Sequence, residues 1–377
     1  MSVARLTVVG LGLMGGSVAA AARRARARLA IRAVDADEPS LALALDRGLV
    51  DEALSPDAAV AAGWFGPGAR NDLVVLGTPV GATAGWLERL AAAGYDGIVT
   101  DLGSTKRLVI ESAERAGGTF RFVGGHPMTG SERSGVGAAS ETLFDGVYYI
   151  LTPTPATDMD AYRMVHAFVT SLGARVVSVD AAAHDDAVAI VSHVPHVTAS
   201  ALVELASSRA EEAGADLLRL AAGGFKDMTR IAAGSPDLWT GICLDNADAL
   251  VAGLSGLEGV LAEFRERVAA GDAEGVRALL ATAADARRAL PAQWVPATTR
   301  LRELSVPVSD RPGVVGIVTT AASRAGCNIE DIEIDHQSED SAVLRLVLTD
   351  EGSVEALLAD LEARGFTPVL RPLEEEA

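Results

Sequence analysis

The stretch Leu6-Thr-Val-Val-Gly10-Leu-Gly12-Leu-Met-Gly15 decides the fold of this chain. The apolar run 6–9 predicts a strand, and the glycines after it open an alanine-rich helix over 15–28. In such a GxGxxG turn the first glycine permits the tight bend, the second lets backbone N–H groups approach a pyrophosphate, and the third lets the helix pack on the strand. The motif predicts a dinucleotide cradle, with cofactor contacts from Gly10, Leu11, Gly12, Leu13, Met14 and Gly15.

An acidic residue at the end of the second predicted strand indicates which nucleotide binds. Asp35 follows the glycines by about 20 residues, where a carboxylate accepts hydrogen bonds from the adenosine ribose. A carboxylate favours a free 2′-hydroxyl over a 2′-phosphate, so NAD is expected, although Arg26 and Arg32 leave NADP open. Thr78 and Pro79 follow the third predicted strand and are also expected at the cofactor, because ligands bind at the carboxyl ends of parallel strands.

Three domains are expected outward from this motif. Up to residue 178 short apolar strands alternate with helices, which predicts an α/β Rossmann-like domain with a parallel sheet covered on both faces. Residues 179–292 have helical periodicity and predict an all-α domain, which by analogy with other dehydrogenases dimerises and helps to bind substrate. After a proline-punctuated linker, residues 299–373 follow the ferredoxin-like order β-α-β-β-α-β.

Composition excludes several classes of partner. The chain has 377 residues, with 32 Lys and Arg against 51 Asp and Glu, a formal net charge of −19. So acidic a surface repels phosphate backbones and anionic lipid, so neither nucleic acid nor a membrane is expected as a partner. An anionic substrate would then need local cations. Two cysteines, Cys243 and Cys327, provide no disulfide framework and fit a reducing compartment.

No membrane span or signal peptide is expected. The longest uncharged runs, 7–22 and 187–203, fall short of the ~20 apolar residues that a span requires. Arg5 is followed at once by the first strand rather than by an apolar leader segment. The sequence therefore predicts a cytoplasmic protein.

Two residues that follow predicted strands are candidates for proton chemistry. His126 follows a strand and two glycines and precedes a proline, so rigid backbone holds it at the carboxyl edge of the sheet. A histidine there can take the proton that an alcohol loses when it gives up hydride; a structural histidine that only pairs with backbone is the alternative. Ser104 begins a predicted helix, where it is either a helix cap or a second polar group at the site.

A third cluster lies in the helical region. His193 and His196 are three residues apart and so share one helix face, but no cysteine or acidic cluster completes a zinc site, and no metal is expected. Lys226 and Arg230 are cations beside glycines in an acidic chain. Arginine grips a carboxylate with two parallel hydrogen bonds, so the cluster indicates a carboxylate-bearing alcohol next to a nicotinamide; surface salt bridges are the alternative.

These motifs resemble the prephenate dehydrogenase family of tyrosine biosynthesis. The segments that carry the resemblance are 9–17, 101–106, His126-Pro-Met with Gly130 and Glu132, Ser192-His-Val-Pro-His196, 223–232, and Trp239 with Asn246 and Ala249. At the C-terminus, segments 310–314 and 326–329 resemble the amino-acid-binding turns of an ACT domain. The resemblance covers nearly the whole chain.

The resemblance implies a role for each matching residue. His126 would bind the ring hydroxyl of prephenate and take its proton as hydride passes to NAD, with Ser104 orienting His126 and the nicotinamide. His196 would line the substrate pocket and Arg230 would hold a substrate carboxylate. Further substrate-binding residues would be Lys226 and Glu132, near the pocket mouth, and Gly223. Ala222, Gly223 and Met228 show small departures from the family pattern; the Met228 change leaves the finer substrate preference open.

The resemblance also implies a homodimer that converts prephenate to 4-hydroxyphenylpyruvate. The alternatives are an arogenate dehydrogenase, a β-hydroxyacid dehydrogenase, which does not account for the histidine motifs, and a non-catalytic sensor of NAD and an amino acid. The ACT domain would bind L-tyrosine as a feedback effector through Gly313, Val314, Asn328 and Ile329. A plain dimerisation module is the alternative for this last domain, because allostery needs a second site and two states.

Overall fold

The computed structural model describes residues 3–130, 133–213, 217–289, 302–309, 314–327, 329–338, 341–348 and 352–372. It divides the chain into two compact units, residues 1–263 and 264–377. Each unit has its own hydrophobic core.

The first unit contains an eight-stranded sheet in the order β3-β2-β1-β4-β5-β6-β7-β8. The strands are β1 (Arg5–Val9), β2 (Ala30–Val34), β3 (Glu52–Leu54), β4 (Asp72–Leu76), β5 (Ile98–Asp101), β6 (Arg121–Pro127), β7 (Tyr148–Thr152) and β8 (Arg175–Ser178). The first six are parallel, and their order reverses between β1 and β4. This is the Rossmann arrangement, in which the ligand lies at the point of reversal.

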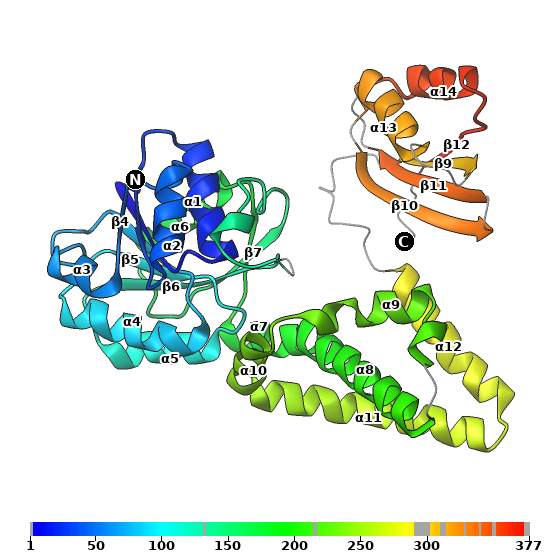
Figure 1. The fold of residues 1–377 in the computed structure, drawn as a ribbon, viewed down its shortest axis with the longest axis horizontal. Coiled ribbons are helices and arrows are strands. Elements are labelled where there is room, and N and C mark those ends of the chain that lie inside the picture. The colour runs from blue at the N-terminus through cyan, green and yellow to red at the C-terminus, as the bar shows by residue number, and fades with distance from the viewer. Residues whose placement is uncertain are drawn as a thin grey trace. The chain divides into compact units, whose positions relative to one another are not determined.

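Helices cover both faces of this sheet (Figure 1). They are α1 (Leu13–Ala25), α2 (Glu38–Asp46), α3 (Pro56–Ala61), α4 (Val80–Ala92), α5 (Arg107–Ala116) and α6 (Met159–Ser171). Along β4, Leu73 and Val75 pack in the core under α1, α2 and α6, whereas Val74 and Leu76 pack in the core under α3, α4 and α5. A strand that is buried on both sides explains the continuous apolar runs that predicted a parallel sheet.

Two features of the sheet differ from the sequence prediction. The predicted strand 120–123 extends to Pro127, because Gly124–Pro127 pairs antiparallel with β7, so His126 lies inside a strand and opposite Ile150 rather than in a loop. The three-residue edge strand β3 was not predicted. It is too short to carry a periodic signal.

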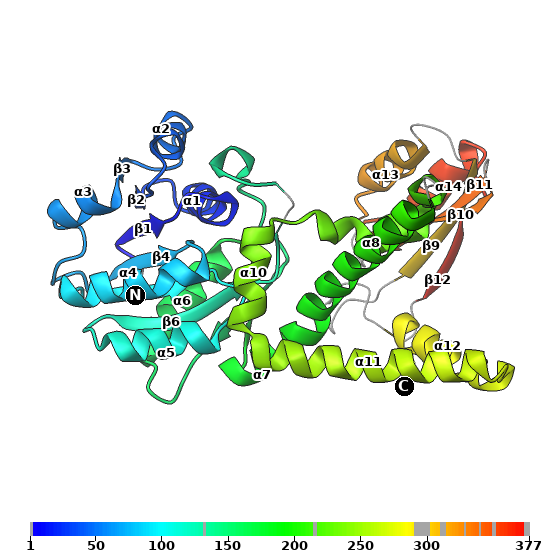
Figure 2. The same cartoon turned by 60° about the horizontal axis from the view of Figure 1, so that its bottom comes forward.

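The helical part of this unit follows β8. It contains α7 (Ala181–Val188), the π-helical turn η2 (Ala189–His193), α8 (Val194–Ala213), η3 (Leu217–Leu220), α9 (Gly223–Thr229), η4 (Arg230–Ala233), α10 (Pro236–Asp245) and α11 (Ala247–Ala269). The predicted helix 181–209 is thus interrupted by a π turn that carries Ser192 and His193. Such turns are frequent at functional sites. Figures 1 and 2 show α7 beside the end of α5, where the two helices are in contact.

One stretch of the described helices, Ala181–Ala210, is long and apolar enough by composition to cross a membrane. Helices of protein cores pass the same test, so this is a weak indication. The beginning of the stretch contains the buried polar residues His184 and Asp185, which bond to other parts of the unit.

The second unit begins with the end of α11 and α12 (Ala273–Arg288). Its remaining elements are β9 (Arg302–Ser309), α13 (Val314–Arg324), β10 (Ile329–Ser338), β11 (Ser341–Leu348), α14 (Val354–Ala363) and β12 (Val369–Pro372). The antiparallel sheet has the order β10-β11-β9-β12, and Val318 and Leu357 from its two helices pack against Leu304 and Leu344. The predicted βαββαβ order is confirmed.

Candidate active site at the carboxyl edge of the sheet

The glycine turn between β1 and α1 forms a cradle. Gly10 has a φ of +94°, and a Cβ on Gly15 would lie 1.9 Å from the Gly10 carbonyl oxygen, so neither position accepts a side chain without displacement of the backbone. A Cβ on Gly12, the residue that caps α1, would meet no atom within 4 Å. The turn is closed toward the protein and open above the helix N-terminus, which fits a dinucleotide pyrophosphate.

Asp35 lies beside this cradle. Its two carboxylate oxygens accept hydrogen bonds from the Leu11 N–H (2.5 Å) and the Asp37 N–H (2.8 Å). Arg32, which could have paired with the 2′-phosphate of NADP, is instead bonded to Glu52 at 3.1 Å and stacked over the Trp64 ring at 4.7 Å. Arg26 is the C-cap of α1, at the opposite end of that helix from the cradle. The geometry fits NAD.

Thr78 and Pro79 lie at the same edge. Pro79 is the N-cap of α4, and the Thr78 hydroxyl is 3.2 Å from that of Thr83 in the first turn of that helix. A Cβ on Gly10 would meet the backbone of Gly77 at 2.8 Å. The turn after β4 therefore contacts the glycine cradle.

His126 points its Nδ1 atom at a second histidine. His126 Nδ1 and His184 Nε2 are 2.8 Å apart, and the two rings are nearly perpendicular. His184 Nδ1 is in turn 2.8 Å from a carboxylate oxygen of Asp185. His184 and Asp185 are both buried. The first helix after the sheet thus brings a histidine–carboxylate pair against the candidate base.

The Asp185 carboxylate also binds the N-terminus of α5. Its two oxygens accept hydrogen bonds from the backbone N–H groups of Lys106 and Arg107, each 2.8 Å long. Burial opposes ionisation of this carboxyl, but the hydrogen bonds from His184 and the two backbone groups outweigh it, so the pKa of Asp185 is lowered. The carboxylate is charged and held in place at the positive end of the helix.

The strand residue before His126 is held by a buried ion pair. Lys106 Nζ is bonded to the carboxylate of Asp101 and donates to the Gly125 carbonyl at 2.8 Å. Asp101 accepts from the Gly125 N–H at 3.0 Å. Both backbone groups of Gly125 are therefore bonded to the ion pair, which fixes the strand at His126.

The electrostatics of the site keep His126 neutral. Burial lowers the pKa of His126 well below its ordinary value, and the positive charge of Lys106 lowers the pKa further, with smaller effects from His184 and His193. A neutral imidazole at neutral pH can accept a proton, so His126 is suited to act as a base.

The other predicted site residues lie near this centre to different degrees. Ser104 is half-buried in the turn between Asp101 and Lys106. His196 is buried and stacks on Trp239 at 3.5 Å, and its Nδ1 has no hydrogen-bond partner among the described residues. Gly223 and Lys226 are exposed in α9, and Arg230 is exposed in η4. Glu132 lies outside the described residues.

Three functional contacts were missed from the sequence. The sequence predicts neither the His184–Asp185 pair nor the pairing of Lys106 with Asp101, and it marks Asn246 only through the family resemblance. The Asn246 amide donates to the Asp185 carbonyl at 2.7 Å and lies 3.3 Å from His193 Nδ1. A signal was present, because three of the six histidines fall at 184, 193 and 196 in one helical stretch.

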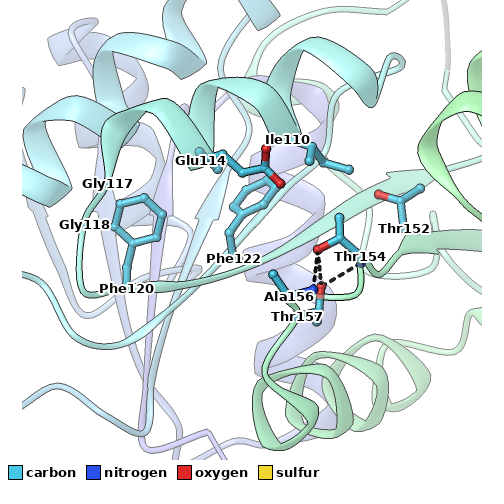
Figure 3. A pocket seen from close by; sticks show the side chains of 11 residues that line it. Ile110, Glu114, Gly117, Gly118, Phe120, Phe122, Thr152, Thr154, Ala156 and Thr157 are labelled. Atoms are coloured by element: carbon cyan, nitrogen blue, oxygen red, sulfur yellow. Dashed lines mark hydrogen bonds between the residues drawn. The ribbon is translucent and has the colours of Figure 1, made fainter.

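A pocket of about 200 Å³ lies elsewhere in the unit, between α5, the beginning of β6 and the turn after β7 (Figure 3). Its walls include Glu114, Phe120, Phe122 and Thr154, and none of the predicted site residues. Among the described residues, no group of histidine, cysteine and acidic side chains could hold a metal ion.

Two family models match the chain. Residues 18–178 match the nucleotide-binding domain of prephenate dehydrogenase, and residues 180–282 match its dimerization domain. The prephenate dehydrogenase of Bacillus subtilis is 33% identical over 364 residues, which is 95% of this chain and 96% of that protein. The chain belongs to the prephenate dehydrogenase family.

Solved structures of this family match about three quarters of this chain. The prephenate dehydrogenase of A. aeolicus, in complex with hydroxyphenyl propionate and NAD+, covers 77% of this chain and 99% of that one, with a TM-score of 0.72 and 32% identity. The match to the arogenate dehydrogenase of Synechocystis covers 76% of this chain and 99% of that protein, with a TM-score of 0.64 and 30% identity. As a member of the prephenate dehydrogenase family, the chain is an NAD-dependent oxidoreductase. His126 belongs to the first matched domain and His184 to the second, so both domains build the site.

Proposed function

We propose that this chain oxidises and decarboxylates prephenate to 4-hydroxyphenylpyruvate in tyrosine biosynthesis, with His126 as the base. The observation that carries the role of His126 is its place at the carboxyl edge of the sheet, with Nδ1 bonded to His184 and a lowered pKa. The cradle at Gly10, Gly12 and Gly15, with Asp35, would hold the dinucleotide at the same edge.

The residues of the chain supply orientation and proton transfer. Bound NAD+ accepts a hydride. His126 takes the proton of the ring hydroxyl as hydride leaves the carbinol carbon, which leaves a ring ketone conjugated to the carbon that bears the carboxylate. Carbon dioxide then departs, and the electron pair of the broken bond moves through the ring to the ketone oxygen, which regains a proton as the ring becomes aromatic. The protein needs to supply a base, orientation and complementary charge.

The substrate is a dianion, so its carboxylates need local cations in a chain of net charge −19. Arg230 would hold one carboxylate, His196 would line the pocket beside Trp239, and Lys226, Gly223 and Glu132 would lie near its mouth. Ser104, in the turn between Asp101 and Lys106, would orient the substrate and the nicotinamide.

A homodimer is the proposed assembly. Several apolar side chains that are more than half exposed lie on α8, on α11 and in the π turn between α7 and α8, among them Ile190, Val191, Leu205, Val251 and Leu261. A second copy would cover them, and the match to a dimerization domain supports this. Both cysteines are free, which fits the proposed cytoplasmic location.

Arogenate is the second candidate substrate, because the Synechocystis structure with 30% identity is an arogenate dehydrogenase. For the second unit we propose an ACT regulatory domain that binds L-tyrosine. Its βαββαβ order supports this, with Val314 beginning α13 and Ile329 beginning β10. The other two proposed effector contacts, Gly313 and Asn328, lie outside the described residues.

The decisive experiment measures NAD+ reduction with prephenate and with arogenate, each with and without tyrosine. We expect turnover of prephenate, inhibition by tyrosine, and a ~10²–10⁴-fold fall of kcat in His126→Asn. His166→Asn changes an exposed histidine on α6 of the same unit and should retain wild-type turnover. Wild-type turnover by His126→Asn, with prephenate bound normally, would exclude His126 as the base.

A further inference from the structure

The hydrogen bonds of Asp185 determine which nitrogen of each histidine carries a proton. An ionised carboxylate can only accept, and Asp185 faces His184 Nδ1 at 2.8 Å, so His184 Nδ1 must be the donor. In neutral His184 the other nitrogen, Nε2, then has a lone pair. With His184 neutral, His126 Nδ1, 2.8 Å away, carries the proton of that bond.

The same reasoning identifies the reactive atom. A neutral imidazole that is protonated at Nδ1 has its lone pair at Nε2. His126 is thus set to accept a proton at Nε2, the nitrogen on the far side of the ring from His184. Without this chain of hydrogen bonds both tautomers of His126 would be populated, and the one protonated at Nε2 could not accept a proton at that nitrogen.

Asp185 is unusually well held for this task. The backbone N–H groups of Lys106 and Arg107 bond to its two oxygens, and the Asn246 amide bonds to its carbonyl. Two segments distant in sequence therefore hold Asp185: the start of α5 bonds to its carboxylate, and Asn246 bonds to its backbone carbonyl. Its neighbour Asp186 is instead exposed and ion-paired with the Arg107 side chain.

We propose that Asp185 and His184 are positioning residues that fix the tautomer of His126 and stabilise its protonated state. We call His126, His184 and Asp185 the histidine relay. When Nε2 of His126 takes the proton of the substrate hydroxyl, the Nδ1 proton is shared with His184 Nε2, and the new positive charge faces Asp185. The total proton count of the relay rises by one and falls again when that proton is released. This inference rests on the proposed role of His126 as the base.

Two substitutions at His184 separate the two ends of the relay. In His184→Gln the amide oxygen replaces Nε2 as the acceptor for His126, whereas in His184→Asn the amide NH₂ replaces Nδ1 as the donor to Asp185. We expect His184→Asn to lower kcat ~10–100-fold with an unchanged KM for NAD+, as supporting hydrogen-bond partners typically do. His184→Gln should recover a large part of that loss.

The charge of Asp185 is tested through the pH profile. The groups that act on His126 from the surrounding elements are Lys106, His184 and His193. In Asp185→Asn we expect a lower kcat. We also expect the acidic limb of the pH profile of kcat/KM to shift by about one unit to lower pH, because a negative charge that favours the protonated relay is lost. Asp186→Asn, the same change one residue along, should leave kcat and the limb unchanged.

The tautomers themselves are measured without activity. Six histidines make a ¹⁵N-histidine spectrum of the full chain tractable, and His126→Asn and His184→Asn assign the resonances of these two residues. We expect the Nδ1–H tautomer for both His126 and His184 at neutral pH. An Nε2–H tautomer for His126, or His184→Asn and Asp185→Asn variants that behave like Asp186→Asn, would overturn the relay. Both outcomes are distinct from failure of the proposed function, which would appear as wild-type turnover by His126→Asn.

Discussion

Lys106 and Asp101 form an ion pair in which the lysine side chain is 0% and the aspartate side chain 2% exposed. Burial lowers the pKa of Lys106, although the nearby carboxylates of Asp101 and Asp185 act in the opposite direction. The pair bonds to both backbone groups of Gly125, next to the candidate base. The ion pair therefore holds β6 in position beside His126.

Lys106→Met removes the cation and leaves a buried carboxylate alone. We expect a loss of ~3–5 kcal/mol in the free energy of unfolding, since an uncompensated buried charge is costly. Urea unfolding checks this. The double variant Asp101→Asn/Lys106→Met buries no charge and still accepts from the Gly125 N–H, so it should be more stable than Lys106→Met alone. A double variant that is less stable would contradict this explanation.

Gly125→Ala places a methyl group where there is no room. Its Cβ would lie 2.8 Å from the Asp101 carbonyl oxygen and 2.9 Å from the Thr100 hydroxyl. We expect a destabilisation of ~1–3 kcal/mol together with lower turnover. Gly85→Ala, in the exposed side of α4 where a Cβ meets nothing, should instead stabilise by ~0.5–1 kcal/mol. The two urea midpoints should therefore move in opposite directions.

Asp35→Asn keeps an acceptor for the Leu11 N–H and removes the negative charge. We expect the ratio of kcat/KM for NADP+ to that for NAD+ to rise ~10–100-fold, the worth of a hydrogen bond to a charged group. Asp37→Asn is the control, because the Asp37 carboxylate caps α2 through the Ser40 N–H at 2.9 Å. Its nucleotide preference should remain that of the wild type.

Arg230→Ala tests the proposed carboxylate contact. We expect KM for prephenate to rise ~10–100-fold with little change in kcat, because a charged hydrogen bond is lost in the ground and transition states alike. Arg163→Ala removes another exposed arginine, which pairs with Asp160 on α6, and should leave KM unchanged. An unchanged KM in Arg230→Ala would remove this residue from the proposed site.

We expect the protein to lose stability as the pH falls below about 6.5, because of its buried histidines and at a higher pH than its carboxylates titrate. Burial lowers the pKa values of His126, His193 and His196. Below the ordinary histidine pKa of about 6.5, these histidines are protonated in the unfolded chain but not in the folded chain. The free energy of unfolding is therefore highest above that pH. It decreases below that pH by at most ~1.4 kcal/mol per pH unit for each histidine. Urea midpoints at several pH values and one protein concentration measure the slope, which should be shallower in His126→Asn.

The sequence was sufficient for the features that depend on local chemistry. The cradle could be predicted because Gly10 and Gly15 satisfy backbone requirements that only glycine meets, and Asp35 follows at the spacing of one βαβ unit. The order of strands and helices in both units follows from periods of hydrophobicity. The boundary of β6 was missed, because its last residues become a strand only by pairing with β7.

The candidate base was recognised from its neighbours in sequence, but the groups that control it were not. His184 and Asp185 are 58 and 59 positions beyond His126, and nothing in the spacing of those residues specifies that α7 packs against the beginning of α5. The contact between α7 and α5 is a property of the folded unit. It forms only when helix packing buries His184 and Asp185, which then bond to each other. Local sequence therefore determined the fold class and the cradle and indicated the candidate base, while tertiary packing decided which buried polar groups contact that histidine.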